Sequence, residues 1–276
     1  MKRVSIQGIK GSFHEDAALK YFKNEEVEIV ECKTFKQAVE MVDKDHVDLC
    51  VMAIENSIAG SLLGNYSLMR QYHLRIIGEV YLHIEMNLLM NKGADPQKIK
   101  EIHSHPIALK QCMEYIEKHA QEAILLEKSD TAGAAKALME SKRTDVATIG
   151  NTRTSELYEL EIKEKGIETN KRNYTRFLVL TKQSKTTLEN NKTSICFECG
   201  HYHGSLANVL KIFSEYEINL TKIQSIPILG KPEEYSFHVD LEYLDQDKYE
   251  KAIHKALKNV SSLSILGEYK KGIMPR

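Results

Sequence analysis

The chain has 276 residues, of which 42% are hydrophobic and 28% charged, and its formal net charge at pH 7 is −1. This length suits about two domains, and the composition is that of an ordinary globular protein that can bury a core. The near-neutral balance and the lack of a basic stripe argue against a nucleic-acid partner. No apolar stretch approaches the roughly 20 residues of a membrane span, so we expect no membrane partner either.

Two features bear on the cellular compartment. The N-terminus has the pattern of a strand and lacks the apolar core of a signal peptide. The five cysteines, an odd number, are typical of a reducing compartment. Cys196 and Cys199 form a C-x-x-C in a strand-like run, but no second ligand pair lies at zinc spacing. We therefore expect a cytoplasmic protein and interpret this pair as a chance feature of a strand.

The first two-thirds of the chain alternates short apolar runs with amphipathic segments, which predicts an α/β fold with mainly parallel strands. The expected strands are residues 4–7, 27–32, 49–54, 123–126 and 146–149, with two extended segments within 75–91. The expected helices are residues 14–22, 35–44, 61–72, 107–119 and 132–140.

The last third has a different order of elements. Residues 182–192 are polar apart from Leu188, which predicts a linker. Beyond it we expect, in chain order, strand 193–199, helix 205–216, strands 219–228 and 235–243, helix 248–258 and strand 264–269. This βαββαβ order predicts a ferredoxin-like module.

Four times in the first part, small polar residues stand between the end of a strand and the start of a helix. The carboxyl ends of strands line the ligand crevice of open α/β sheets, and helix N-termini attract anions. The four places are Gly8 to Phe13 with Ser12, Glu55-Asn56-Ser57, Ser104 to Cys112, and Ser129-Asp130-Thr131. Ordinary helix capping is the alternative at each, and it is favoured for Asp130 and Thr131.

The third place gives the most detailed expectation. We expect Ser104 to be the N-cap of a helix with Pro106 in its first turn. Ser104 and Gln111 lie seven residues apart, so one face of the helix would present both. An ordinary cap plus a surface glutamine is the alternative. His105 could serve as a general acid, although a first-turn histidine is more often structural, and it stays unassigned.

The run Asn173-Tyr174-Thr175-Arg176-Phe177 places a hydroxyl and a guanidinium ahead of an apolar run that predicts a buried strand. The simple alternative is the start of a strand with Arg176 facing solvent. Taken with the runs at 55–57 and 104–112, in this order and at these separations, it resembles the signature of prephenate dehydratase. The resemblance covers almost the whole chain.

This resemblance implies an enzyme that converts prephenate to phenylpyruvate in L-phenylalanine biosynthesis. Aromatisation of the ring drives the reaction, so we expect no metal and no cofactor. Thr175 would be the hydroxyl beside the leaving group, and Arg176 a partner for a substrate carboxylate. The implied catalytic residues are Thr175, Asn56, Ser104 and Gln111, and the implied substrate-binding residues are Arg176, Ser12, Ser57 and Phe177. A structural role is favoured for Glu55, because a carboxylate repels a dianion.

The resemblance also implies how the body is divided. Family members resemble two-lobed periplasmic binding proteins, in which the chain crosses between the lobes twice. Residues 1–181 would form the catalytic domain, with residues 1–76 and 161–181 in one lobe and 77–160 in the other. Residues 193–276 resemble an ACT domain, a module that binds amino acids in regulated enzymes.

Regulation by L-phenylalanine is implied at a contact between two such modules, in a homodimer or homotetramer. The implied effector residues are Gly204, Ser205, Leu206 and Asn219, for which a loop and the start of a strand are the plain alternative. Gln224 and Ile226 replace a glutamate and an arginine of the family pattern, which leaves weak sensitivity or a different effector open.

Three positions in the body also depart from the family pattern. Ile9 and Ala53 stand where proline is usual, and Ile107 replaces a glutamine. None of them is among the implied catalytic residues, so activity is still expected. Two other functions stay open. One is arogenate dehydratase, which acts on the aminated relative of prephenate. The other is a non-catalytic small-molecule sensor.

Overall fold

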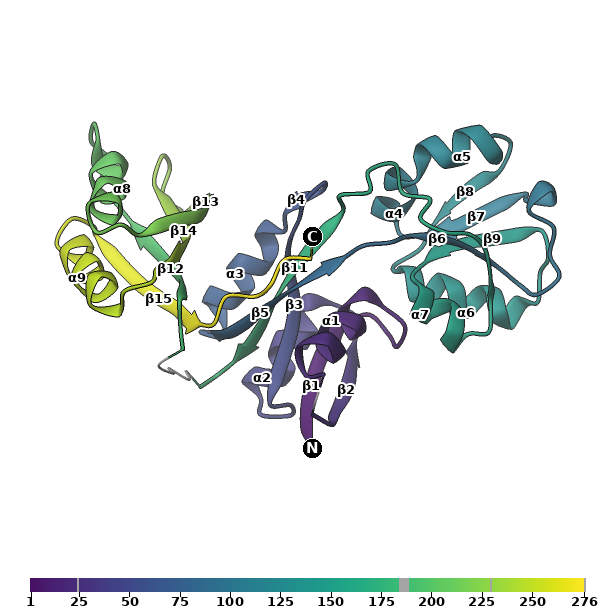
Figure 1. The fold of residues 1–276 in the computed structure, drawn as a ribbon, viewed down its shortest axis with the longest axis horizontal. Coiled ribbons are helices and arrows are strands. Elements are labelled where there is room, and N and C mark those ends of the chain that lie inside the picture. The colour runs from purple at the N-terminus through teal and green to yellow at the C-terminus, as the bar shows by residue number, and fades with distance from the viewer. Residues whose placement is uncertain (24, 184–188, 229, 276) are drawn as a thin grey trace. The chain divides into compact units, whose positions relative to one another are not determined.

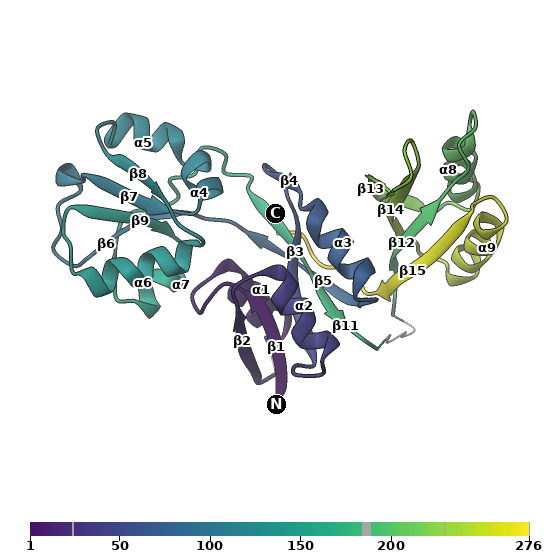
Figure 2. The ribbon, with the colours of Figure 1, turned by 180° about the vertical axis from the view of Figure 1, so that it is seen from behind.

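The computed structural model describes residues 1–23, 25–183, 189–228 and 230–275 (Figures 1 and 2). Contacts divide the chain into two compact units. Unit 1 comprises Met1–Tyr72, Val80–Leu178 and Met274–Arg276, and unit 2 comprises His73–Glu79 and Val179–Ile273. Residues 184–188 of the expected linker lie outside the described residues.

The first sheet is built around the N-terminal strands. Its order is β2-β1-β3-β11-β5, with the short β4 paired to β3, and β1 runs parallel to both β2 and β3. The strands are β1 (Lys2–Gln7), β2 (Val27–Cys32), β3 (Leu49–Asn56), β4 (Gly60–Ser61), β5 (Arg75–His83) and β11 (Tyr174–Thr181). Helices α1 (Phe13–Tyr21), α2 (Phe35–Asp43) and α3 (Leu63–Gln71) pack on its strands. The first six residues of β3 are buried, as its apolar run predicts.

The second sheet has the order β10-β6-β9-β7-β8. Its strands are β6 (Asn87–Met90), β7 (Glu101–Ser104), β8 (Ile124–Glu127), β9 (Val146–Gly150) and β10 (Glu161–Glu164). The helices of this part of the chain are η1 (Pro96–Lys98), α4 (Pro106–Gln111), α5 (Met113–His119), α6 (Thr131–Ser141) and α7 (Thr152–Leu157). Pairing is parallel for β7 with β8 and β9, and antiparallel for β6 with β9 and β10. The sheet is therefore mixed.

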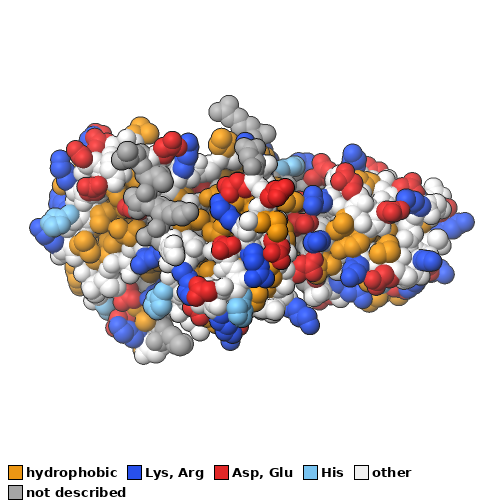
Figure 3. All heavy atoms as spheres, turned by 90° about the horizontal axis from the view of Figure 1, so that it is seen from below, with side chains coloured by type: hydrophobic (Ala, Val, Ile, Leu, Met, Phe, Trp, Pro, Cys, Tyr) orange, Lys and Arg blue, Asp and Glu red, His pale blue; other side chains and the backbone are white. Residues whose placement is uncertain are grey.

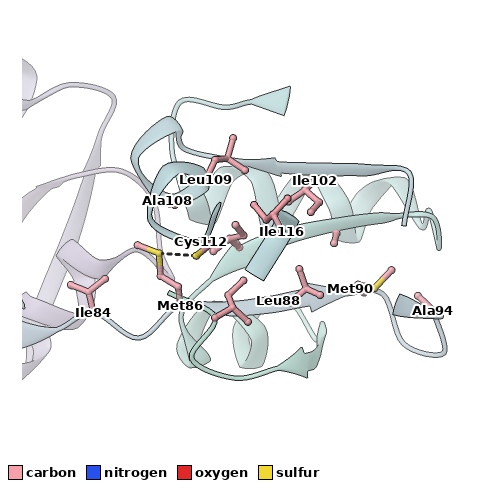
Figure 4. Packing of buried hydrophobic residues seen from close by; sticks show 13 residues of the cluster. Ile84, Met86, Leu88, Met90, Ala94, Ile102, Ala108, Leu109, Cys112 and Ile116 are labelled. Carbon is pink, nitrogen blue, oxygen red and sulfur yellow. Dashed lines mark hydrogen bonds between the residues drawn. The ribbon is translucent and has the colours of Figure 1, made fainter. Parts of the chain in front are cut away.

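The core beside this sheet joins its strands with helices α4 and α5. Figure 4 shows Leu88, Ile102, Leu109 and Ile116 among its buried side chains. The same view shows Cys112 beside Met86, with 3.6 Å between the two sulfur atoms. Cys112 also ends α4, because its N–H bonds both the Ala108 and the Leu109 carbonyl oxygen. The single helix predicted over 107–119 is therefore wrong, since two helices meet at this buried residue.

The two sheets, each with its helices, form a first and a second lobe, but the crossing points predicted between the lobes are wrong. β5 keeps the chain in the first sheet through His83, and β10 pairs with β6 in the second sheet. The chain therefore crosses after His83 and returns after Glu164. The two passages bond to each other: the Ile84 N–H donates to the Asn173 carbonyl at 2.7 Å, and the Met86 N–H donates to the Glu168 carboxylate at 2.8 Å.

Two predicted helix starts are also wrong. Ser104 is the last residue of β7, its hydroxyl donates to the Ile149 carbonyl at 3.1 Å, and the N-cap of α4 is His105. Gly60 and Ser61 pair back onto β3, so α3 begins only at Leu63. Ser104 is held by the pairing of β7 with the distant β8 and β9, whereas Gly60 and Ser61 are held by a short hairpin with Glu55 and Asn56. The cap favoured at Asp130 is confirmed, since its side chain accepts from the Gly133 N–H, and Ser12 caps α1 by accepting from the Glu15 N–H.

Unit 2 contains a four-stranded antiparallel sheet of order β13-β14-β12-β15. In chain order its elements are β12 (Lys192–Glu198), α8 (Ser205–Glu215), β13 (Asn219–Pro227), β14 (Tyr235–Glu242), α9 (Gln246–Leu257) and β15 (Ser262–Tyr269). Figures 1 and 2 show α8 and α9 together on one face of it. The predicted ferredoxin-like order is confirmed. Buried Phe197, Phe213 and Val239 belong to the core between sheet and helices.

The surface carries charges of both signs. Figure 3 shows Lys and Arg side chains interspersed with Asp and Glu over the face drawn. All five cysteines are free thiols. Within the described ranges, the structure contains no helix with the length and apolar character needed to traverse a bilayer.

Candidate active site

Unit 1 contains a cavity of about 510 Å³ at the carboxyl ends of strands from both sheets. Its lining includes the predicted residues Ser12, Asn56, Gln111, Thr175 and Phe177. They come from the start of α1, the end of β3, the end of α4 and the start of β11. Segments more than 100 residues apart in sequence therefore meet around one space.

Asn56 has an orientation that the backbone determines. Its Oδ1 accepts from the Ile58 and Ala59 N–H groups at 2.9 and 2.8 Å. A backbone N–H can only donate, so the amide nitrogen must face the opposite way. That Nδ2 donates to Thr175 Oγ1 at 2.9 Å and to Asn173 Oδ1 at 2.8 Å. The Thr175 oxygen thus accepts a hydrogen bond, which leaves its own proton for another acceptor.

The orientation of Asn56 also determines which way the hydrogen bonds to Gln111 run. Because Asn173 Oδ1 accepts from Asn56, the Asn173 Nδ2 donates to Gln111 Oε1 at 3.0 Å. The Gln111 Nε2 then lies 3.4 Å from Asn56 Oδ1 and carries a second N–H. Gln111 lines the cavity and is 8% exposed. The network therefore presents two donors to the cavity, the Thr175 hydroxyl and the Gln111 amide.

Two histidines in the lining are held neutral. His105 Nδ1 accepts from the Ile107 N–H at 3.3 Å, so Nε2 carries the proton, and burial lowers the pKa of His105. Burial also lowers the pKa of His14 to about 4. His14 Nε2 accepts from the Ala53 N–H at 3.4 Å. Both rings are therefore neutral hydrogen-bonding groups near pH 7, and neither supplies a positive charge.

An aromatic wall stands beside the polar network. The ring of Phe177 meets His14 edge-on at 5.1 Å between centroids, and the ring of Phe35 is tilted against His14 at 5.4 Å between centroids. All three line the cavity, as does Phe13. Such a wall suits a flat, unsaturated ring, with the hydrogen-bond donors directed at its substituents.

The loop that carries Ser12 is fixed by α7, an element the sequence did not predict. Thr154 Oγ1 donates to the Gly11 carbonyl at 2.7 Å, and Arg153 Nε donates to Glu15 Oε2 at 2.9 Å. Asn151, the N-cap of α7, donates to Asp16 at 2.6 Å. Burial raises the pKa of Asp16 to about 6. These contacts join the two lobes next to the cavity.

Three predicted residues lie outside this lining. Ser104 is completely buried, as described above. Ser57 and Arg176 line a smaller cavity of about 180 Å³ that Asn56 shares. Arg176 is 3% exposed, and its Nη1 lies 3.5 Å from Glu55 Oε1. The carboxylate of Glu55 therefore faces a guanidinium in the smaller cavity, which fits the structural role favoured for it.

The sequence did not indicate that three further residues shape the site. Asn173 lies inside the quoted motif, but only the fold shows that its amide links Asn56 to Gln111. His14 opens a helix, and nothing in its spacing indicates a cavity. Asp130 gave only a capping signal, yet it lines the cavity together with Ser129 and Thr131. In the described part of the chain, no three His, Cys, Asp or Glu side chains gather as metal ligands would.

The implied effector residues occupy two places in unit 2. Gly204 is the N-cap of α8, with φ at +81°, and Ser205 and Leu206 begin the helix. Asn219 begins β13, beyond the other end of α8. At 1.5 Å per residue, the 11 residues of α8 separate these places by about 16 Å.

Comparison with known proteins agrees with this geometry. The family model for prephenate dehydratase matches residues 4–185. A prephenate dehydratase of Methanocaldococcus jannaschii is 36% identical over 94% of this chain and 95% of its own. The Arabidopsis thaliana chloroplastic arogenate dehydratase/prephenate dehydratase 2 is 35% identical over 97% of this chain and 72% of its own.

Solved structures share the fold. A prephenate dehydratase of Arthrobacter aurescens in complex with L-Phe has a TM-score of 0.87 at 24% identity, covering 97% of this chain and 89% of its own. GqqA, described as a novel type of quorum quenching acylase, also has a TM-score of 0.87, at 25% identity over 98% of both chains. The family model matches more than half of the chain, and the Methanocaldococcus relative is similar over almost its whole length. The chain therefore belongs to the prephenate dehydratase family, whose members are carbon–oxygen lyases.

Proposed function

We propose that the 510 Å³ cavity binds prephenate and that Thr175 donates a hydrogen bond to the departing ring hydroxyl. The observation that carries this proposal is the Asn56 amide, which donates to Thr175 Oγ1 at 2.9 Å. With its oxygen already accepting, the Thr175 hydroxyl points its proton at a further acceptor. A threonine is a very weak acid, so it acts by hydrogen bonding, or through water, at the oxygen where negative charge develops.

The reaction needs little more from the protein. The ring carboxylate leaves as carbon dioxide, its electron pair moves into the ring, and the hydroxide at the opposite carbon departs and takes up a proton. The protein must hold the ring and both leaving groups in line and exclude competing geometries. Phe177 and Phe13 contact the ring in this proposal, and Gln111 and Ser12 donate to its polar substituents. Arg176 and Ser57 line the smaller cavity, which shares Asn56 with the larger one.

The first prediction is that purified protein converts prephenate to phenylpyruvate in the presence of a chelator. Aromatisation supplies the driving force, and the donors described above come from the chain itself. Phenylpyruvate formation is measured spectroscopically with and without EDTA. The cofactor-free proposal fails if EDTA abolishes activity and one metal restores it. A protein that binds prephenate without forming product would instead be the sensor left open by the sequence.

We propose further that residues 193–276 are an ACT domain through which L-phenylalanine inhibits the enzyme. The βαββαβ order supports this, and the related Arthrobacter protein was solved with L-Phe. Gly204 and Asn219 lie at opposite ends of α8, so one module cannot hold a small amino acid between them. A site that uses both residues needs two modules, which is why we propose a homodimer or homotetramer. The free thiols support a cytoplasmic location.

The second prediction is that L-phenylalanine binds the protein with measurable heat and lowers its activity, and that the protein has the mass of an oligomer. Calorimetry, activity and analytical ultracentrifugation follow one titration. Asn219→Ala should weaken binding, while the control Asn259→Ala, in the turn after α9, should not. If L-phenylalanine at millimolar concentration gives no heat of binding and leaves activity unchanged, the regulatory proposal is wrong. If the protein has the mass of a monomer, the proposal of a site shared by two modules is wrong.

A further inference from the structure

Asp130 is a carboxylate in the lining of a cavity proposed to bind a dianion. It is half-buried at the N-terminus of α6. Its Oδ1 accepts from the Gly133 N–H at 2.6 Å, and its Oδ2 accepts from the Ser129 hydroxyl at 3.2 Å. Each carboxylate oxygen can accept more than one bond, so capping the helix leaves Asp130 able to accept from a ligand.

The local sequence makes room for this carboxylate. A Cβ added at Gly133 would lie 3.0 and 3.1 Å from the two Asp130 oxygen atoms. An alanine there would have been the better helix former. Glycine in the first turn therefore lets the carboxylate seat closely on the helix and keep its place at the cavity wall.

The rest of the lining offers no compensating cation. Among the described residues that line the cavity there is no lysine and no arginine, and His14 and His105 are held neutral. The formal side-chain charge of the cavity near pH 7 therefore comes from Asp130 and is negative. A second carboxylate brought against Asp130 is repelled, whereas an ammonium group is attracted, and both effects are strengthened by partial burial.

Prephenate and arogenate differ in one side-chain group, which the negative charge of Asp130 would attract in arogenate only. Both carry a ring carboxylate and a side-chain carboxylate, but arogenate has an ammonium where prephenate has a ketone. The net charge of arogenate is therefore −1, and that of prephenate is −2. A cavity with one carboxylate and no cation fits the first better than the second.

We propose that Asp130 is a specificity-determining residue that binds the substrate ammonium group and so directs this site toward arogenate. This assignment rests on the proposed function, because it uses the same cavity and the same chemistry. Arogenate loses its ring carboxylate as carbon dioxide and its ring hydroxyl, with one proton, as water. The product is then phenylalanine, and no oxidant or further reactant is needed. Asp130 takes no part in bond breaking.

The test compares kcat/KM for arogenate and for prephenate in the wild type and in Asp130→Asn and Asp130→Ser. Both replacements remain good N-caps, so α6 keeps its start while the charge is removed. We expect the arogenate-to-prephenate ratio to fall at least about 10-fold in both, mainly through the KM for arogenate. Gly133→Ala, which displaces the carboxylate, should lower the ratio in the same direction.

Asp245→Asn is the matched control. Asp245 is the N-cap of α9, its side chain accepts from the Lys248 N–H at 3.0 Å, and it lies in unit 2 outside the cavity. This variant should leave the ratio unchanged. If both substrates are turned over but the ratio stays within twofold in the Asp130 variants, the assignment of Asp130 is overturned while the proposed function stands. If the folded wild type turns over neither substrate, the proposed function fails, and this assignment with it.

Discussion

Replacement of Thr175 by alanine should lower kcat by on the order of 10²–10⁴-fold, with a smaller change in KM. The variant removes the one hydroxyl whose oxygen already accepts from Asn56 and whose proton is directed elsewhere. A donor of this kind acts mainly on the departing oxygen in the transition state, so the loss should appear in kcat. Steady-state kinetics with prephenate and with arogenate measure it.

Thr175→Ser and Thr175→Val are the matched controls. Serine keeps the hydroxyl and should retain most of the activity, whereas valine keeps the shape and should be as impaired as alanine. Asn56→Ala should also lower kcat, because the hydroxyl would lose the amide that orients it. Near wild-type kcat in Thr175→Ala would show that the leaving group finds its proton donor elsewhere in the cavity.

Replacement of Lys192 by methionine should lower the free energy of unfolding of unit 2 by about 3–5 kcal/mol. The Lys192 Nζ lies 3.0 Å from Glu79 Oε1, and the two side chains are 2% and 0% exposed. Methionine fills a similar volume but leaves the Glu79 carboxylate buried without its ammonium partner. Urea unfolding followed by circular dichroism measures the change in the transition of unit 2.

Two further variants separate the buried charge from general packing. Lys270→Met removes an ammonium whose pair with Glu189 is exposed at both ends, so its effect should be small compared with that of Lys192→Met. The double variant Lys192→Met/Glu79→Gln removes both charges and should recover most of the lost stability. A Lys192→Met protein as stable as the wild type would mean that the pair contributes nothing to unit 2.

The sequence alone was sufficient to predict those features of the structure that depend on residues near one another in the chain. The six elements of unit 2 follow from alternating and helical periodicities, and their order determines the ferredoxin-like topology. The caps at Ser12 and Asp130 follow from side chains that reach N–H groups three residues away. The runs at 55–57, 104–112 and 173–177 together were enough to indicate the family, because residue types and their separations are properties of the chain itself.

Only the tertiary structure decided what depends on distant partners. β10 belongs to the second lobe because it pairs with β6, about 70 residues earlier in the chain, and local composition carries no trace of that choice. Ser104 became buried strand rather than a cap for the same reason. Asn56 and Thr175 are 119 residues apart. Two backbone N–H groups fix the orientation of the Asn56 amide, and that amide in turn donates to the Thr175 hydroxyl. The sequence near Asp130 is enough to predict that its side chain caps α6. Only the fold shows that the Asp130 carboxylate also lines a cavity and gives it a negative charge.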